Sequence, residues 1–127
     1  MASAVLDSSA VLAVLNGEPG AELVTTVLDD ALVSTVNYAE VVAKLVERGT
    51  SYAEALAALR AIALTTVDFD IALARRTGAL RAETMRRGLS LGDRACLSLA
   101  EREGAPAMTG DRSWVGAVSG VEIRLIR

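Results

Sequence analysis

The sequence contains no histidine and a single cysteine, Cys96, among its 127 residues. Without histidine, the chain cannot form serine–histidine–aspartate triads, cysteine–histidine pairs, histidine zinc sites or the histidine acid–base pair of metal-independent ribonucleases. One cysteine allows neither an internal disulfide nor a multi-cysteine zinc site, so we expect Cys96 to pack as a small hydrophobic residue. Any chemistry must therefore use carboxylates, hydroxyl groups or the backbone.

Aromatic residues are also scarce, at 3% of the chain, although hydrophobic residues make up 52%. The core must then be built from alanine, valine and leucine, which suits helices packed on a sheet. No apolar run reaches the roughly 18 residues of a membrane span, and the first basic residue is Lys44, so a basic signal-peptide segment is missing. We expect a single cytoplasmic domain over residues 1–127 that makes no membrane contact.

The net charge of −3 argues against indiscriminate nucleic-acid binding, but the charge is unevenly distributed. Residues 1–43 hold six acidic residues and no basic one, whereas six arginines gather between residues 75 and 94. Two interpretations of Arg75, Arg76, Arg86 and Arg87 remain open. They form either a solvated helix face or a set of contacts to RNA phosphates.

Short apolar segments alternate with amphipathic ones along the chain. The apolar segments predict strands at 3–6, 31–34, 64–69, 106–109 and 121–126. The amphipathic segments predict helices at 8–18, 21–30, 35–48, 51–63, 70–88 and 90–104. Alternation of this kind predicts an α/β fold with three layers: a short, mostly parallel sheet of about five strands with helices on both faces.

Four acidic residues are expected at one edge of this sheet. Asp7 directly follows the first strand, and Asp111 follows the fourth strand in the segment MTGDRSW. Glu40 and Asp93 lie near the amino ends of helices that follow strands, which places them at the same edge. Ligands of parallel sheets bind beyond the carboxyl ends of the strands, so this edge is the candidate site.

Each acid also has a purely structural explanation. Asp7 and Asp93 are placed to cap helices, Glu40 can pair with Asn37 in the same way, and Asp111 is a common turn residue. Four caps need not share an edge, however, whereas a hard divalent cation needs several oxygen ligands in one pocket. Mg²⁺ or Mn²⁺ held by carboxylates can activate water and neutralise a phosphate, and a chain without histidine can still perform this chemistry.

Four segments carry a resemblance to a known family. VLDSSAVLAVLNGEPG, STVNYAEVVAKL, LSLGDRACLSLA and MTGDRSW resemble, in content and order, the motifs of PIN domains, and more narrowly of VapC-type toxins from bacterial toxin–antitoxin pairs. They extend from residue 5 to residue 114. Gly110 departs from the pattern, because many relatives carry alanine there.

The resemblance implies a metal-dependent endoribonuclease that is the toxin of a type II toxin–antitoxin pair. It implies Mg²⁺ or Mn²⁺ as cofactor, RNA as substrate, a VapB-like antitoxin as partner and a homodimer. The implied catalytic residues are Asp7, Glu40, Asp93 and Asp111. Asp7 and Asp93 are the implied metal ligands, and the hydroxyl groups of Ser9 and Thr109 are the implied support for the carboxylates.

Arg94 and Arg112 each follow one of these acids directly, so both are candidates to contact RNA. Trp114 could stack on a base, but a lone tryptophan after a turn more often packs in the core. We expect Trp114 to be a packing residue.

Three other functions are compatible with these motifs. A housekeeping PIN nuclease would use the same acids in RNA processing, and a non-catalytic binding module would keep them as a structural cluster. An aspartyl phosphotransferase would also place Asp7 after the first strand, but it needs a nearby lysine and a D-x-D pattern. The only lysine is Lys44, one helical turn past Glu40, and position 9 is serine.

Overall fold

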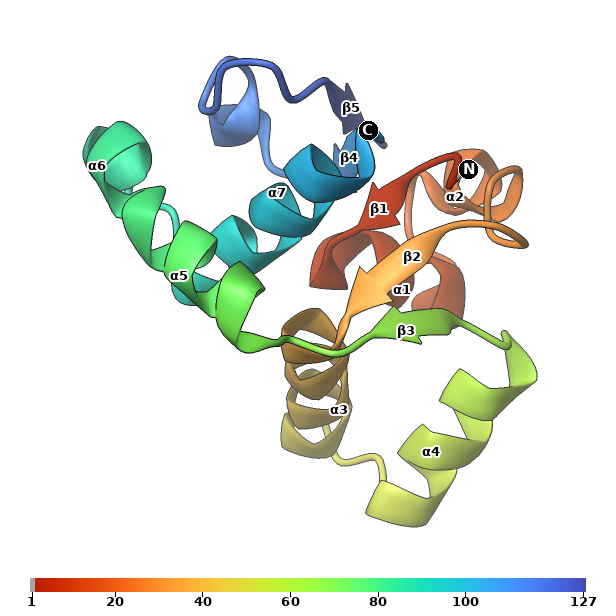
Figure 1. The fold of residues 1–127 in the computed structure, drawn as a ribbon. Coiled ribbons are helices and arrows are strands. Elements are labelled where there is room, and N and C mark those ends of the chain that lie inside the picture. The colour runs from red at the N-terminus through yellow and green to blue at the C-terminus, as the bar shows by residue number, and fades with distance from the viewer. Residues whose placement is uncertain (1) are drawn as a thin grey trace.

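The computed structural model describes residues 2–127, which fold around a five-stranded parallel sheet (Figure 1). The strand order is β3-β2-β1-β4-β5. The strands are β1 (Val5–Leu6), β2 (Leu32–Ser34), β3 (Thr65–Val67), β4 (Ala107–Thr109) and β5 (Ile123–Leu125). The helices are α1 (Ser8–Asn16), α2 (Ala21–Thr25), α3 (Thr35–Glu47), α4 (Tyr52–Ala61), α5 (Ile71–Ala79), α6 (Arg81–Thr84) and α7 (Leu91–Glu103), with 3₁₀ turns η1 (Met85–Arg87) and η2 (Arg112–Trp114).

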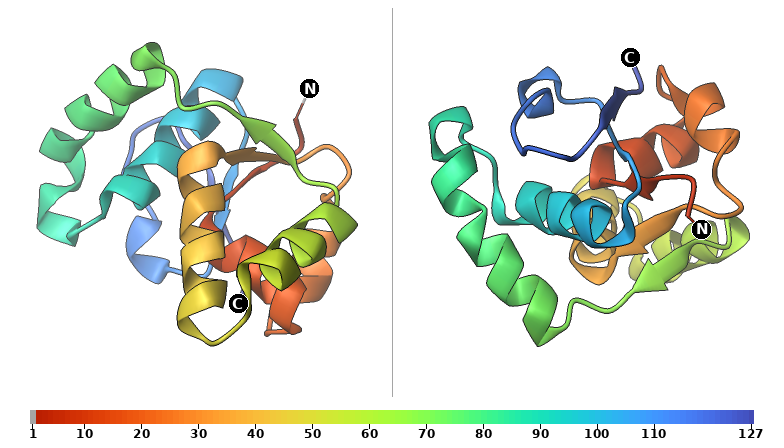
Figure 2. Two further views of the ribbon diagram at one scale, coloured as in Figure 1. Left: turned by 90° about the horizontal axis from the view of Figure 1, so that it is seen from below. Right: turned by 45° about the horizontal axis from the view of Figure 1, so that its top comes forward.

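Two hydrophobic cores lie on opposite faces of the sheet, because successive strand residues point to opposite sides. Leu6, Val33 and Met108 belong to the core formed with α1 to α4. Their neighbours Val5 and Ala107 belong to the core formed with α5 and α7. Figures 1 and 2 show the two groups of helices with the strands between them. The expected three-layer α/β arrangement is confirmed.

The central strand β1 determines where the site forms. It pairs with β2 on one side, through Val5 and Leu32, and with β4 on the other, through Leu6 and Met108. After β1 the chain therefore adds β2 and β3 on one side of this strand, and later β4 and β5 on the other side. The carboxyl ends of β1, β2 and β4 meet at one edge, which is the position where open parallel sheets bind ligands.

Two helical segments are shorter in the structure than the hydrophobic pattern of the sequence predicts. The segment 21–30 is helical only to Thr25, where the hydroxyl groups of Thr25 and Thr26 donate to backbone carbonyl groups at 2.8 and 2.6 Å. The segment 70–88 divides into α5, α6 and η1, and the Thr84 hydroxyl likewise donates to the Leu80 carbonyl at 2.8 Å. Such side-chain bonds compete with regular helix geometry and bend the chain. The strands are also a residue or more shorter than predicted.

The core confirms two packing expectations. Cys96 and Trp114 are both fully buried against the face covered by α5 and α7. Trp114 is therefore a packing residue and is not exposed for base stacking. In residues 2–127 no helix combines the length and the apolar composition needed to cross a membrane.

Candidate active site

Asp7 lies at the centre of the site, between the end of β1 and the start of α1. Its side chain is 5% exposed and caps α1 by accepting a hydrogen bond from the Ala10 amide at 2.9 Å. The Ser9 hydroxyl donates to the same carboxylate oxygen at 2.6 Å, and the Thr109 hydroxyl donates to the other at 2.6 Å. Ser9 and Thr109 therefore contact Asp7 in the supporting positions expected from the sequence, and they fix its orientation.

Asp111 is attached to this centre through the backbone. Its amide donates to the Thr109 hydroxyl at 3.0 Å, and the Gly110 amide donates to the Ser9 hydroxyl at 2.9 Å. The exposed Asp111 side chain caps η2 by accepting from the Ser113 amide and hydroxyl at 2.9 and 2.7 Å. Asp111 thus combines the expected turn role with a place at the rim of the site.

Glu40 reaches the site from α3 and is held by Asn37, the residue with which the sequence predicted it to pair. The side-chain amide of Asn37 donates to a Glu40 carboxylate oxygen at 2.8 Å and to the Gly92 carbonyl at 3.0 Å. Asn37 is 1% exposed, and its Oδ1 accepts no hydrogen bond within residues 2–127. Asn37 therefore joins α3 to the start of α7 and orients Glu40 between them.

Asp93 occupies a complete capping box at the start of α7. The Asp93 amide donates to the Ser90 hydroxyl at 3.2 Å, while the Ser90 amide donates to Asp93 Oδ2 at 2.9 Å. The capping interpretation of Asp93 is confirmed, and only one of its two carboxylate oxygens takes part in this box. A structural role and a ligand role are therefore compatible at this residue.

The acids influence one another electrostatically. Burial, with a smaller contribution from the charge of Asp93, raises the pKa of Asp7 to about 6, against the lowering effect of its bonds to Ser9, Thr109 and Ala10. Burial also raises the pKa of the Cys96 thiol, with added contributions from the charges of Asp7, Asp93 and Glu40. Three of the acids therefore lie near enough to the buried Cys96 to influence its thiol.

The donor set fits a hard divalent cation, because carboxylate oxygens are the ligands that Mg²⁺ and Mn²⁺ prefer. Within residues 2–127, however, no three acidic or sulfur ligands already form a metal-holding group. The side chains of Asp93 and Asp111 each have one oxygen outside their capping bonds, so binding would not require these caps to break.

A family model described as the PIN domain matches residues 4–117. The chain belongs to the PIN domain family. The matched region contains all four acids at the sheet edge, together with Ser9 and Thr109.

Solved structures resemble this PIN domain along nearly its whole length. DNA-bound VapBC from Salmonella typhimurium has a TM-score of 0.79 at 21% identity, with 100% of each chain covered. VapBC2 from Rickettsia felis, bound to a promoter DNA fragment, has a TM-score of 0.72 at 18% identity, with 96% of this chain and 97% of that chain covered. VapBC-5 from Mycobacterium tuberculosis, in the VapBC family of toxin–antitoxin systems, has a TM-score of 0.64 at 23% identity, with 98% of each covered. These likenesses establish the fold; no curated protein sequence matches the chain.

The two arginines expected to contact RNA lie in different surroundings. Arg112 is exposed and lines a hollow together with Asp111. Arg94 is buried, and its guanidinium donates to the Thr77 carbonyl at 3.0 Å. The expectation that Arg94 reaches RNA does not fit this burial, because α7 turns the side chain toward α5. We therefore leave Arg94 out of the interface proposed below.

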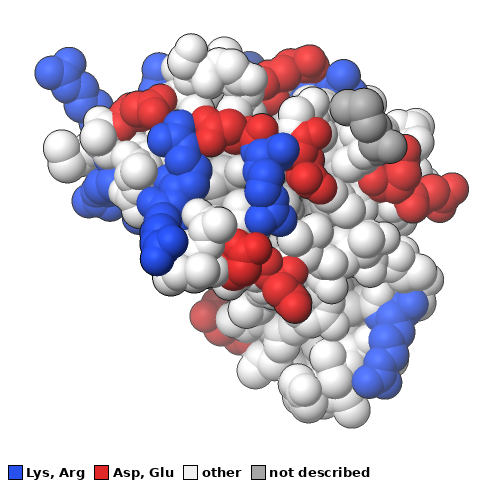
Figure 3. Space-filling view, in the orientation of Figure 1, with Lys and Arg blue, Asp and Glu red and all other residues white. Residues whose placement is uncertain are grey.

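On the arginine face formed by α5 to α7, within residues 2–127, Arg76 and Arg102 form ion pairs with acidic residues, whereas the exposed Arg75, Arg81 and Arg86 form none. Arg76 forms a two-pronged ion pair with Glu101 at 2.6 and 2.7 Å, and Arg102 pairs with Asp70 at 3.2 Å. Arg87 donates instead to backbone carbonyls of residues 113, 115 and 116. Basic and acidic side chains accordingly alternate over this face (Figure 3). These contacts favour the solvated, structural interpretation for Arg76 and Arg87.

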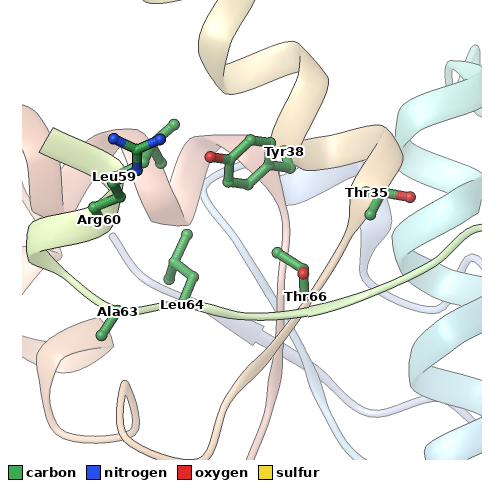
Figure 4. Close-up of a pocket in the computed structure, with 7 residues that line it drawn as sticks. All are labelled: Thr35, Tyr38, Leu59, Arg60, Ala63, Leu64 and Thr66. Atoms are coloured by element: carbon green, nitrogen blue, oxygen red, sulfur yellow. The ribbon is translucent and has the colours of Figure 1, made fainter. Parts of the chain in front are cut away.

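Another hollow, of about 430 Å³, lies away from the acids (Figure 4). Tyr38 from α3 extends toward Leu59 of α4, and Leu64 and Thr66 from the β3 segment form the opposite side. None of the four acids lines this hollow. It is therefore separate from the candidate site.

Gly92 provides a test of the Glu40 position. A side chain at Gly92 would overlap the Glu40 carboxylate, so Gly92→Ala should displace that carboxylate. We expect a loss of nuclease activity of about 100-fold, the cost of a misplacement of about 1 Å, without loss of stability, because alanine favours helices by up to about 1 kcal/mol over glycine. Cleavage assays and thermal melting measure the two effects.

The matched control is Gly78→Ala, in a helix position where an added Cβ meets nothing within 4 Å. It should keep full activity. Equal activity in the two variants would show that the position of Glu40 is unimportant.

Proposed function

We propose that this PIN domain is a metal-dependent endoribonuclease and the toxin of a type II toxin–antitoxin pair. The proposal rests chiefly on hydrogen bonds at one sheet edge: the Thr109 hydroxyl joins Asp7 to the Asp111 amide, and the Asn37 side chain joins Glu40 to the start of α7 beside Asp93. A chain without histidine has no other strong acid–base group for phosphodiester chemistry at neutral pH. The similar folds of VapBC proteins support the toxin assignment.

The residues of the candidate site have different proposed roles. Asp7 and Asp93 would hold a bound Mg²⁺ or Mn²⁺, which supplies Lewis-acid activation of water and charge neutralisation at the phosphate. Ser9 and Thr109 hold Asp7 in one orientation by donating to both of its oxygens. Glu40, oriented by Asn37, and the exposed Asp111 lie at the rim, where each can accept a proton or orient water.

A cleavage assay tests the proposal directly. We expect the purified protein to cut single-stranded RNA with Mg²⁺ or Mn²⁺ and to lose this activity in excess EDTA, since no histidine can replace the ion. Readdition of the metal should restore cleavage. Full activity in EDTA would contradict the metal mechanism, and calorimetry showing no Mg²⁺ or Mn²⁺ binding would favour a non-catalytic module.

We further propose a VapB-like antitoxin as inhibitor. A hollow between α3 and α7 places the apolar side chains of Val36, Ala39 and the exposed Leu91 beside Glu40. A partner segment with an apolar side chain in this hollow and a cationic one over the acids would match both surfaces. A homodimer belongs to the same proposal, and light scattering of the purified chain measures it.

A further inference from the structure

A basic cleft lies beside the acidic site, between the amino half of α1 and the carboxyl half of α3. It has a volume of about 470 Å³. Its basic side chains are Lys44 from α3, Arg48 directly after α3 and Arg127 from the segment after β5. Ser8 and Ser9 from α1 form part of the lining, together with one acidic residue, Glu18. Because the Ser9 hydroxyl donates to Asp7, the cleft begins at the candidate active site.

Arg127 connects this cleft to the rim that carries Asp111. It also lines the neighbouring hollow with Ser9, Gly110 and Asp111. The Arg127 guanidinium donates to the Pro19 carbonyl at 3.0 Å. An added Cβ at Gly110 would lie 2.9 Å from Arg127 Nη2, so a side chain there would push the guanidinium away. The absence of a side chain at Gly110 thus leaves room for Arg127.

The cations of the cleft are poorly compensated, in contrast to Arg76 and Arg102, which form ion pairs with acidic residues. Within residues 2–127, Lys44 forms no ion pair, and Arg127 bonds only to an uncharged carbonyl. Arg48 is 3.9 Å from Glu18, a long and exposed pair that contributes little. Positive charge is therefore available here for an external anion, directly beside carboxylates that would repel one.

We propose that the cleft binds backbone phosphates of the RNA strand on one side of the bond to be cut. Arg127 contacts the phosphate nearest the acids, and Lys44 contacts one further along the strand. This assignment rests on the proposed nuclease function and adds the path of the substrate. Phosphate contacts position a strand without selecting its sequence, so the cleft contributes affinity and register.

The test is RNA binding in EDTA, where the proposed cleavage does not occur. A fluorescent single-stranded RNA of mixed sequence is titrated with the parent protein and the variants over a range of monovalent salt. Each phosphate contact to a single strand contributes about 0.7 to the slope of log Kd against log salt concentration. Lys44→Ala and Arg127→Ala should each weaken binding about fivefold at about 0.1 M salt and together about 25-fold, with the slope reduced by about 1.4.

Two further variants separate the effect of the Arg127 position on RNA binding from the effect of net charge. Gly110→Ala keeps every charge but displaces the Arg127 guanidinium, so it should weaken binding about as much as Arg127→Ala. Arg60→Ala removes an exposed charge from the separate hollow between α3 and α4 and should leave binding unchanged. We expect all four variants to fold, because three of them shorten exposed side chains and Gly110→Ala adds only one methyl group. Melting curves check this expectation.

The outcomes test the cleft assignment separately from the proposed nuclease function. If the parent binds and cuts RNA but Lys44→Ala and Arg127→Ala bind it as the parent does, the cleft assignment is overturned and the nuclease proposal stands. If the parent neither binds nor cuts RNA, both fail. If polyglutamate binds in place of RNA and needs Lys44 and Arg127, the cleft is instead a docking site for an acidic protein segment.

Discussion

Asp7→Asn and Asp93→Asn are each expected to lower RNA cleavage by about 10³-fold or more. A bound cation supplies several kcal/mol of transition-state stabilisation, and each 1.36 kcal/mol corresponds to a factor of ten in rate. Both substitutions keep the side-chain shape and an oxygen acceptor, so the caps of α1 and α7 persist while a charged ligand is lost. Expression of the parent chain should arrest bacterial growth, and expression of either variant should not.

Asp70→Asn is the matched control for these variants. Asp70 caps α5 by accepting from the Leu73 amide at 2.8 Å, as Asp7 caps α1, but it lies on the arginine face away from the acids. It should retain cleavage and growth arrest. If Asp7→Asn cleaves RNA as well as Asp70→Asn does, Asp7 is only a helix cap.

The second large effect concerns stability without metal. The pKa of Asp7 is raised from 3.8 to about 6 in the folded protein, chiefly by burial. The folded state therefore binds more protons than the unfolded state between about pH 4 and pH 6, and the free energy of unfolding falls as the pH rises through this window. A difference of about 2 units amounts to about 3 kcal/mol, all of it lost above pH 6.

Asparagine cannot ionise, so Asp7→Asn should remove this loss. We expect the metal-free variant to be about 2–3 kcal/mol more stable than the parent at pH 8 and nearly equal to it at pH 4. Urea unfolding in EDTA at both pH values measures the difference. A stability difference that is independent of pH would show that ionisation of Asp7 does not lower the free energy of unfolding.

Asp93 should behave differently from Asp7. It is only partly buried, and its capping box stabilises α7, so neutralisation relieves repulsion but weakens the favourable charge at a helix amino terminus. We expect a smaller change for Asp93→Asn than for Asp7→Asn. Mg²⁺ should stabilise the parent and neither variant, because a ligand stabilises only the state that binds it.

The sequence predicted which residues meet at the carboxyl edge of the sheet, because parallel strands impose this arrangement. Once β1 and β4 are identified, Asp7, Ser9 and Thr109 must lie at the same sheet edge, and the structure places them in hydrogen-bond contact. Capping roles were equally predictable, since they depend on residues within one turn. Both inferences use local pattern and strand direction, which the chain encodes directly.

Contacts between elements could not be predicted in this way. Burial of Arg94 depends on how α7 packs against α5, and the Asn37 contact with Gly92 joins residues 55 positions apart. The relation of Arg127 to Gly110 likewise depends on the path of the chain after β5. Helix periodicity places each side chain on a face of its own helix and carries no information on what lies opposite.

The pairing of β1 with β4 also sets the order of events during synthesis. Asp7 obtains its Thr109 hydrogen bond from a residue 102 positions later, and Arg127 reaches Pro19 across 108 positions. At translation rates of about 5–20 residues per second, about 5–20 s pass between the appearance of the first half of the site and the second. A nascent chain therefore has no assembled catalytic edge. Under the proposed nuclease function, the chain cannot cut RNA until its final strands have left the ribosome and docked, and the proposed inhibitor has this interval in which to bind the earlier segments.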